Sequence, residues 1–264
     1  DFLVNRFGRQ LYLQFFKEYT EKVWGVTCEQ ISADWGAQRI KGLSIGKALL
    51  HALKRPFQRA GNFAGQQTAT SLIERFLYPK YGPGQMWETT AGRLDAAGGR
   101  VVKRAKVVGI GLRDGRAVQV TIEESAGERH TIECGNVVSS MPVRELVGAL
   151  GDAAPEGVRG IAGALQYRDF ITVGLLYRKF RPRRESVDPA THRVPDNWIY
   201  IQEPGVKVGR LQIFNNWSPY MVRDPNTIWV GLEYFCLEGD GLWSMSDSAL
   251  VELGVKEMQK IGLA

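Results

Sequence analysis

The sequence predicts a mixed α+β fold in which antiparallel sheets combine with helices. Two observations support this prediction. The middle and later parts of the chain alternate apolar and polar residues in short runs that end at Gly, Pro or Asn, as hairpin strands do. The first and last segments instead repeat apolar residues at helical spacing. With 264 residues, the chain is long enough for one large domain or two ordinary ones.

The first part of the chain is predicted to be helical. Apolar and aromatic residues recur there at helical spacing, at Leu11, Phe15, Phe16 and Tyr19. They predict an amphipathic helix over residues 5–19 whose aromatic face is buried. Residues 31–40 indicate a second helix with Ser32 as a candidate N-cap. Residues 41–67 give a mixed signal, helical at first and then small and polar like a loop.

A three-stranded meander is predicted in the middle of the chain. Asp114-Gly115 lies between two β-rich runs, and this pair favours a tight hairpin because glycine tolerates positive φ. A short buried strand is expected to follow at 136–142, and then a helix at 143–150. The β-rich runs of the meander are 100–112, 116–125 and 129–134.

The last third of the chain predicts an antiparallel sheet and a closing helix. Gly, Pro and Asn turns separate its strands, so the sheet is expected to form a unit of its own. A terminal helix over 246–262 begins with a serine cap candidate. The predicted strands are 169–179, 197–203, 209–217 and 227–235.

Composition narrows the classes of function. Hydrophobic residues make up 44% and charged residues 23%, as in globular proteins, and no apolar run is long enough to span a bilayer. The three cysteines are far apart, and with three histidines they form no metal-ligand pattern. We therefore expect no metal site and no disulfide, in a reducing, cytoplasmic compartment.

Charge gives a second constraint. The net charge of +6 could suit nucleic acid, but the Lys and Arg residues are dispersed and no recognition motif accompanies them. We therefore expect a small-molecule substrate, with an anionic ligand as a good explanation of the charge. The oligomeric state stays open. Because the chain opens without Met or a signal-peptide pattern, we expect a piece of a longer protein.

A glycine-rich stretch, “YGPGQMWE”, raises the question of a phosphate loop. A dinucleotide fingerprint needs a third glycine where Trp87 stands, and a P-loop needs a following Gly-Lys-Ser/Thr, which is absent. Spacing therefore favours a structural turn.

Five blocks of sequence carry a family resemblance: “RFGRQLYLQFFKEYTEKVWG”, “ADWGAQRI”, “YPKYGPGQMWE”, “VVSSMPVRELVGAL” and “LQIFNNWSPY”. In this order they resemble UDP-galactopyranose mutases, particularly the eukaryotic type, and related bacterial flavoproteins of the amine oxidase and protoporphyrinogen oxidase superfamily. The resemblance implies an antiparallel-sheet substrate domain with helices, together with part of an FAD-binding, Rossmann-like domain that holds the β-meander.

The resemblance also implies a division of the chain. Residues 1–77 would be a helical part of the substrate domain, 78–150 a partial FAD-binding domain, and 151–264 the substrate-domain sheet with its terminal helix. A middle fragment of this kind would lack the N-terminal dinucleotide-binding unit and the C-terminal FAD segment. FAD would then be the cofactor of the parent protein and would bind this chain weakly or not at all.

Four cofactor-binding positions follow from the resemblance. Gly82 and Gly84 would let the backbone pass close to the flavin ring. Val107 would contact the adenine through its backbone, and Ser140 would lie on a strand beside the cofactor. The same residues equally suit an ordinary turn and ordinary strand positions.

Five substrate-binding positions follow in the same way: Trp24, Arg39, Tyr200, Arg210 and Trp217. Indole rings pack against flat uracil or sugar faces, and guanidinium groups pair with phosphate oxygens. A core tryptophan and a solvated arginine are the ordinary alternatives. Trp217 replaces a tyrosine of the mutases, and Thr20 stands where they tend to have asparagine, so these departures leave the substrate open. No catalytic side chain is assigned.

Three functions therefore stay open. The first is a fragment of an FAD-dependent enzyme that resembles UDP-galactopyranose mutase and mediates ring contraction of a nucleotide sugar. The alternative is an FAD-dependent oxidoreductase of the amine oxidase type, acting on an amine or another organic substrate. The second alternative is a non-catalytic scaffold fragment.

Overall fold

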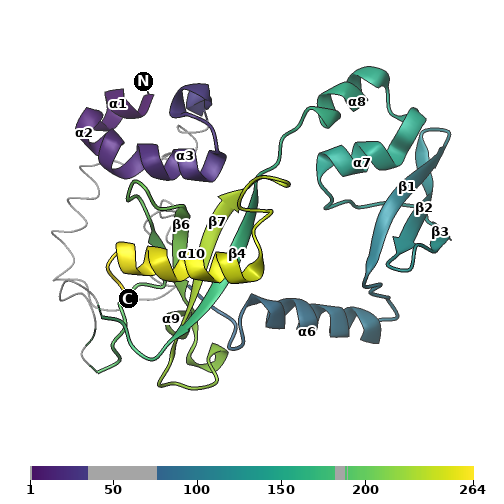
Figure 1. Cartoon of the computed structure of the whole chain (residues 1–264). Coiled ribbons are helices and arrows are strands. Elements are labelled where there is room, and N and C mark those ends of the chain that lie inside the picture. The colour runs from purple at the N-terminus through teal and green to yellow at the C-terminus, as the bar shows by residue number, and fades with distance from the viewer. Residues whose placement is uncertain (1, 35–75, 182–187, 189) are drawn as a thin grey trace, which may run out of the picture. The chain divides into compact units, whose positions relative to one another are not determined.

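The computed structural model of the chain describes residues 2–34, 76–181, 188 and 190–264 (Figure 1). The chain divides into two compact units, which are described separately below. The first comprises residues 1–86 and 168–264, and the second comprises residues 87–167. The predicted partition at residues 77 and 150 stays a prediction.

The first unit begins with a run of short helices. Gly8 has a φ of +82° and separates the first helix from the second, since that conformation suits glycine. The elements are α1 (Phe2–Phe7), α2 (Arg9–Leu11), the wider π-helical turn η1 (Tyr12–Lys17), α3 (Glu18–Trp24) and the short 3₁₀ turn η2 (Cys28–Gln30).

The helical prediction for residues 5–19 is confirmed, but the prediction of a buried aromatic face is wrong in part. Phe7 and Phe16 stack at 5.1 Å, whereas Leu11 is 39% and Phe15 45% exposed. The physical reason is η1. Its wider turn advances the chain by a different angle per residue, so residues at ordinary helical spacing no longer share one face.

The second predicted helix lies mostly outside the described residues. At its start the Ser32 hydroxyl accepts the N–H of Asp34 at 3.3 Å, as an N-cap side chain does. The mixed segment 41–67 lies outside the described residues altogether.

A four-stranded antiparallel sheet forms the centre of the first unit, which confirms the predicted sheet. It does not form a unit of its own as predicted, because residues 1–86 belong to the same compact unit. Its strands follow the order β4-β7-β6-β5, so the last strand in sequence lies in the interior of the sheet. After β6 come the short helices α9 (Phe214–Trp217) and η6 (Pro219–Met221). The strands are β4 (Asp169–Tyr177), β5 (Trp198–Tyr200), β6 (Val208–Ile213) and β7 (Ile228–Cys236).

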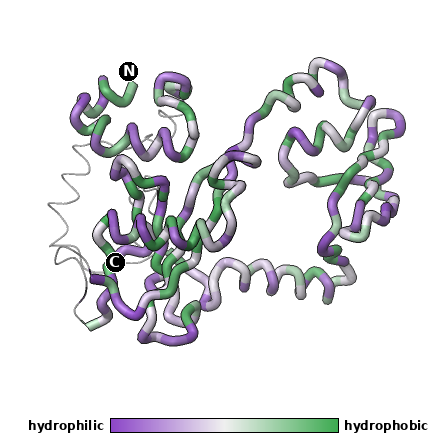
Figure 2. Tube along the Cα trace, viewed as in Figure 1, coloured by the Kyte–Doolittle hydropathy of each residue, from purple (hydrophilic) through white to green (hydrophobic). Residues whose placement is uncertain are grey.

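One face of this sheet carries the core. Helix α10 (Asp247–Lys260) covers it, and the strands of the sheet are rich in hydrophobic residues (Figure 2). Ser246 caps α10 as predicted, because its hydroxyl accepts the N–H of Ala249 at 3.3 Å. Fully buried side chains of the core are Val208, Leu211, Ile213, Val230, Leu232, Tyr234 and Met258.

A buried carboxylate ties α10 to the sheet. Glu257 is 6% exposed and accepts the backbone N–H groups of Lys207 at 2.6 Å and Val208 at 2.9 Å. The neighbouring Tyr234 hydroxyl has its pKa raised by burial and then by the Glu257 charge. The carboxylate thus satisfies backbone donors at the start of β6 that would otherwise be buried without partners.

The second unit contains the predicted meander. Strands β1, β2 and β3 pair antiparallel in sequence order. Asp114 and Gly115 both have positive φ, 50° and 73°, which confirms the predicted hairpin turn. The strands are β1 (Ala105–Arg113), β2 (Arg116–Glu124) and β3 (Arg129–Glu133).

Helices complete this unit. Helix α6 (Pro83–Ala96) continues across the boundary between the units, and none of its residues is buried. Helix α7 (Val143–Leu150) confirms the prediction for 143–150, and η5 (Gly151–Ala153) and α8 (Glu156–Gly163) follow it. The small cluster between α7 and α8 consists of Val147, Ala154 and Ala162.

The predicted short buried strand at 136–142 is wrong. This segment has no strand structure, and Val137 and Val138 are 37% and 99% exposed. A strand needs a neighbouring strand to pair its backbone groups, and no described strand pairs with these residues. A β-branched sequence alone therefore does not form a strand here.

Two predictions of absence concern the described residues only. None of their helices has the length and apolar character that a bilayer crossing requires. No group of His, Cys, Asp and Glu among them is suited to hold a metal ion, and Cys28, Cys134 and Cys236 are free thiols.

Removal of the Glu257 carboxylate tests its structural role. We expect Glu257→Ala to lower the free energy of unfolding by about 2–5 kcal/mol, because two backbone donors lose their acceptor in a buried place. Urea denaturation followed by circular dichroism measures this change. The matched control is Glu252→Ala on the same helix, whose side chain is 67% exposed and pairs with Lys256. Equal effects of the two substitutions would contradict the assignment.

Candidate functional site

The candidate site lies on the face of the four-stranded sheet opposite to its core. Side chains alternate along each strand, so the residues between the core positions project to this second face. We call it the aromatic face. It consists of Phe170, Thr172, Gly174 and Leu176 of β4, Trp229, Gly231, Glu233 and Phe235 of β7, Arg210 and Gln212 of β6, and Trp198 and Tyr200 of β5.

Arg210 lies at the centre of the polar part of this face. Its guanidinium carbon is 4.8 Å from the ring centre of Trp198 and 4.9 Å from that of Phe235. One terminal nitrogen forms an ion pair with the Glu233 carboxylate. The Nε donor is buried and has no partner in the described part of the chain. With 21% of its side chain exposed, Arg210 still reaches solvent.

Glu233 is a buried charge on a central strand. Its side chain is 3% exposed, and besides Arg210 it accepts the amide N–H of Gln212 at 2.5 Å. A buried carboxylate is costly unless it is paired, and both contacts offset that cost. The charge of Arg210 is therefore already compensated within the sheet.

Tyr19 approaches the same group from helix α3. Its ring meets Tyr200 edge to face at 4.8 Å between centres. Burial raises the pKa of the Tyr19 hydroxyl to about 12, although the neighbouring Arg210 acts in the opposite direction. The phenol is therefore protonated at neutral pH and can donate a hydrogen bond.

Trp217 belongs to an aromatic cluster that adjoins the Arg210 group. Its ring centre lies 5.1 Å from that of Tyr78, 5.7 Å from that of Phe76 and 6.2 Å from that of Trp198. Its indole N–H is buried and lacks a hydrogen-bond partner among the described residues. Trp198 thus connects Trp217 with Arg210 and Tyr200.

The structure therefore brings three of the five predicted substrate residues together. Tyr200 and Arg210 are directly opposite each other on β5 and β6, and Trp217 reaches both through Trp198. Trp24 lies at the C-terminal end of α3 and is 40% exposed. Arg39 lies outside the described residues.

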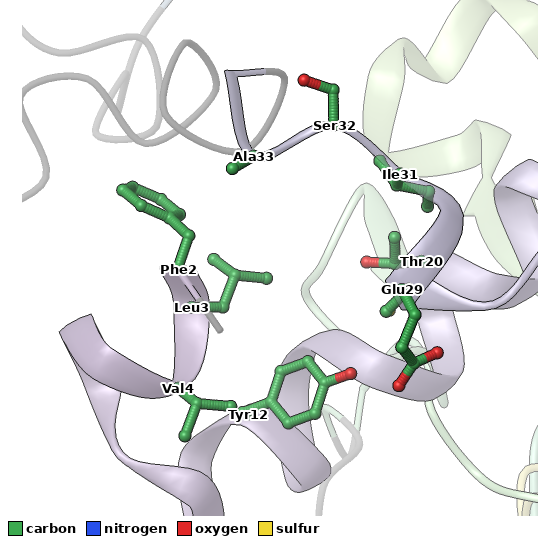
Figure 3. Close-up of a pocket in the computed structure, with 10 residues that line it drawn as sticks. Phe2, Leu3, Val4, Tyr12, Thr20, Glu29, Ile31, Ser32 and Ala33 are labelled. Carbon is green, nitrogen blue, oxygen red and sulfur yellow. The ribbon is translucent and has the colours of Figure 1, made fainter.

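Thr20 lies in a separate hollow beside the N-terminal helices. This hollow has a volume of about 180 Å³ and is lined by Thr20, Tyr12, Cys28 and Glu29 together with apolar side chains (Figure 3). Thr20 is 7% exposed, whereas its neighbour Tyr19 reaches the aromatic face. Successive helical residues point in different directions, so α3 contributes Tyr19 to the aromatic face and Thr20 to the hollow.

Hydrogen bonds from the side chains of Lys22 and Arg168 to backbone carbonyls hold α3 in place. Lys22 donates to the carbonyls of Ile201 and Glu203 at 3.1 and 2.8 Å. Arg168 donates to the carbonyl of Val23 at 3.1 Å and to that of Phe235 at 3.2 Å. A cation at the C-terminus of a helix satisfies its free carbonyl groups. These contacts fix Tyr19 above the sheet.

The four predicted cofactor residues were placed at a turn and on strands. Gly82 has a φ of +87° and turns the chain into α6, and the Gln85 side chain accepts the N–H of Tyr81 just before that turn at 3.0 Å. A side chain at Gly84 would meet no atom within 4 Å. Val107 lies on the edge strand β1 before a bulge, and Ser140 is exposed. Gly82 is buried and Val107 is half-buried. Ser140 lies on no strand, so its predicted strand position is wrong, for the same reason as for the whole segment 136–142.

Sequence reasoning missed four residues of the site: Tyr19, Trp198, Glu233 and Phe235. Strand alternation could have found the last three, since each occupies the same face as Arg210. The clearest signal was Glu233, the charged residue in the otherwise uncharged strand “IWVGLEYFC”. A lone charge in such a strand indicates a buried partner.

Comparisons with known proteins show similarity at the level of structure. No protein-family model and no curated protein sequence matches the chain. A crystal structure of reduced UDP-galactopyranose mutase matches it with a TM-score of 0.69 and 18% identity, over 99% of this chain and 50% of that one. The chain shares the fold of half of this mutase. The predicted α+β fold class is thereby confirmed.

A second solved structure is also similar. It is an oxidoreductase from Methanosarcina mazei, with a TM-score of 0.52 and 13% identity, over 70% of this chain and 40% of that one. At such identities the similarity concerns the fold, since one scaffold hosts several chemistries. The chain spans half the length of the mutase structure, so a whole protein's activity is not shown by it.

The packing of the aromatic face can be tested at Gly209. A Cβ atom at this position would lie 2.6 Å from a ring carbon of Phe235, which covers Arg210. We expect Gly209→Ala to lower the free energy of unfolding by about 1–3 kcal/mol and to change the near-ultraviolet circular dichroism of the aromatic residues. In Gly241→Ala, the control, the new methyl group meets open space. Unchanged spectra in the Gly209 variant would disprove the close packing.

Proposed function

We propose that this chain supplies the substrate-binding sheet, and part of the cofactor-binding region, of an FAD-dependent enzyme similar to UDP-galactopyranose mutase. The observation that carries the proposal is the arginine held between aromatic rings on the open face of the sheet. The fold shared with a UDP-galactopyranose mutase over nearly the whole chain supports it. The substrate would be a nucleotide sugar, and no nucleic acid or membrane partner is proposed.

The aromatic face suits the two parts of such a substrate. Tyr200 is 52% and Trp198 39% exposed, and their rings stack at 6.2 Å, so they offer flat surfaces for a uracil or sugar ring. Arg210 and the phenol of Tyr19 offer donors to a phosphate oxygen. Trp24, Arg39 and Trp217 are proposed to complete this site.

The cofactor would be held by Gly82, Gly84, Val107 and Ser140. A bound flavin supplies the electron chemistry for the reaction of the sugar ring. The side chains of this chain would bind the substrate, orient it and donate hydrogen bonds to its phosphate oxygens. The fragment itself is proposed to be inactive, and the parent protein to be a cytoplasmic enzyme.

One observation favours a second candidate, an oxidoreductase that acts on an amine or another organic substrate. Glu233 neutralises Arg210, so the aromatic face as a whole presents aromatic rings with little net charge. Such a wall suits an uncharged organic molecule. A fold shared with an oxidoreductase is compatible with this reading.

Product analysis tests the two candidates. The complete protein that contains these residues is reduced with dithionite and incubated with UDP-galactose, and we expect the furanose isomer to form. Absence of this product, together with no UDP-induced change in flavin or tryptophan spectra, would exclude the mutase. Oxygen consumption with a panel of amines would then support the oxidoreductase. Failure of both assays in a flavin-loaded protein would leave the scaffold function.

Substitution of Arg210 tests its role in binding. Arg210→Lys keeps the positive charge but loses the planar fork, so we expect the affinity for UDP to fall about tenfold. Quenching of tryptophan fluorescence measures binding, because Trp198 lies next to Arg210. The control is Arg223→Lys, an exposed arginine of the same unit. Equal affinity in both variants would remove Arg210 from the binding site.

A further inference from the structure

Glu233 has no role yet in the proposed reaction, although its burial needs an explanation. It lies on β7 with 2% of its surface exposed, among residues without charge. Its two carboxylate contacts are the terminal nitrogen of Arg210 and the amide of Gln212. Burial of a hydrophobic residue at this position would cost less free energy than burial of a charge. This difference indicates that the carboxylate is needed by a neighbouring side chain.

The strand register brings Glu233 and Arg210 together through a bulge. Val208 is opposite Tyr234, and Arg210 is opposite Glu233, so two residues of β6 span one step of β7. In a regular ladder Gly209 would pair with Glu233, and Arg210 would pair with Leu232 and project into the core, because a one-residue shift exchanges the faces of a strand. The bulge thus places the arginine on the aromatic face.

The surroundings of Arg210 restrict how a ligand can reach it, and they include the hydroxyl of Tyr19. Trp198 and Phe235 contact its guanidinium group, and Glu233 holds one terminal nitrogen. The Nε donor has no partner among the described residues. Because the two rings cover the faces of the guanidinium group, a ligand acceptor would approach in its plane, at the part of the side chain that is exposed.

We propose that Glu233 is the positioning residue of Arg210. Its carboxylate fixes the plane of the guanidinium group, so that the exposed part of this group is held in the orientation that an oxyanion of the substrate would meet. The binding of an oxyanion rests on the proposed function, whereas the fixing of Arg210 by Glu233 does not. Gln212 supports the arrangement, since its amide holds the other oxygen of the carboxylate.

The exchange rate of the Arg210 Nε–H proton tests the proposal directly. In ¹⁵N-labelled protein its signal is assigned by its loss in Arg210→Lys. We expect Glu233→Gln to increase the exchange rate about tenfold or more, because an amide offers one acceptor oxygen where two donors, on Arg210 and Gln212, need one each. Glu233→Asp keeps both acceptors, and we expect an intermediate rate.

The control is Glu252→Gln, an exposed substitution that should leave the exchange rate unchanged. An unchanged rate in Glu233→Gln would overturn the proposal. If that variant does not fold, as judged by circular dichroism, Glu233→Asp decides by the same criterion. Addition of UDP to the wild type separates the two claims. A failure of UDP to shift the Arg210 Nε–H signal contradicts the proposed function, while the effect of Glu233 on exchange remains.

Discussion

The antiparallel pairing of β6 with β7 is the constraint on which both the core and the candidate site depend. These strands lie in the interior of the four-stranded sheet, and their alternate residues fill the core beneath α10. The bulge at Gly209 shifts the register once, so that Arg210 joins the opposite face. A single extra residue thus separates a charged group from the hydrophobic interior.

Buried charges are satisfied in pairs on both faces of this sheet. On the core face, Glu257 accepts the backbone N–H groups of Lys207 and Val208 at the start of β6 and joins α10 to the sheet. On the aromatic face, Glu233 pairs with Arg210. Both carboxylates would be costly alone, so each indicates a neighbour that needs it. One neighbour is structural, and the other belongs to the candidate site.

Much of the fold followed from local pattern. Alternation predicted the strands of both sheets, and Asp114-Gly115 predicted its turn, because these signals depend on nearby residues alone. The strand predicted at 136–142 does not form, because a strand depends on a pairing partner that lies outside its own sequence. The predicted burial of Leu11 and Phe15 was wrong because a π-helical turn changed the number of residues per turn.

The sequence by itself determined most of the strands and helices, and it singled out Tyr200, Arg210 and Trp217 through a family resemblance. Only the tertiary structure decided that Arg210 is held by Glu233 and covered by Trp198 and Phe235. The physical reason is that secondary structure depends on neighbours along the chain. The pairing of a buried charge depends instead on strand register, which is set when distant segments meet.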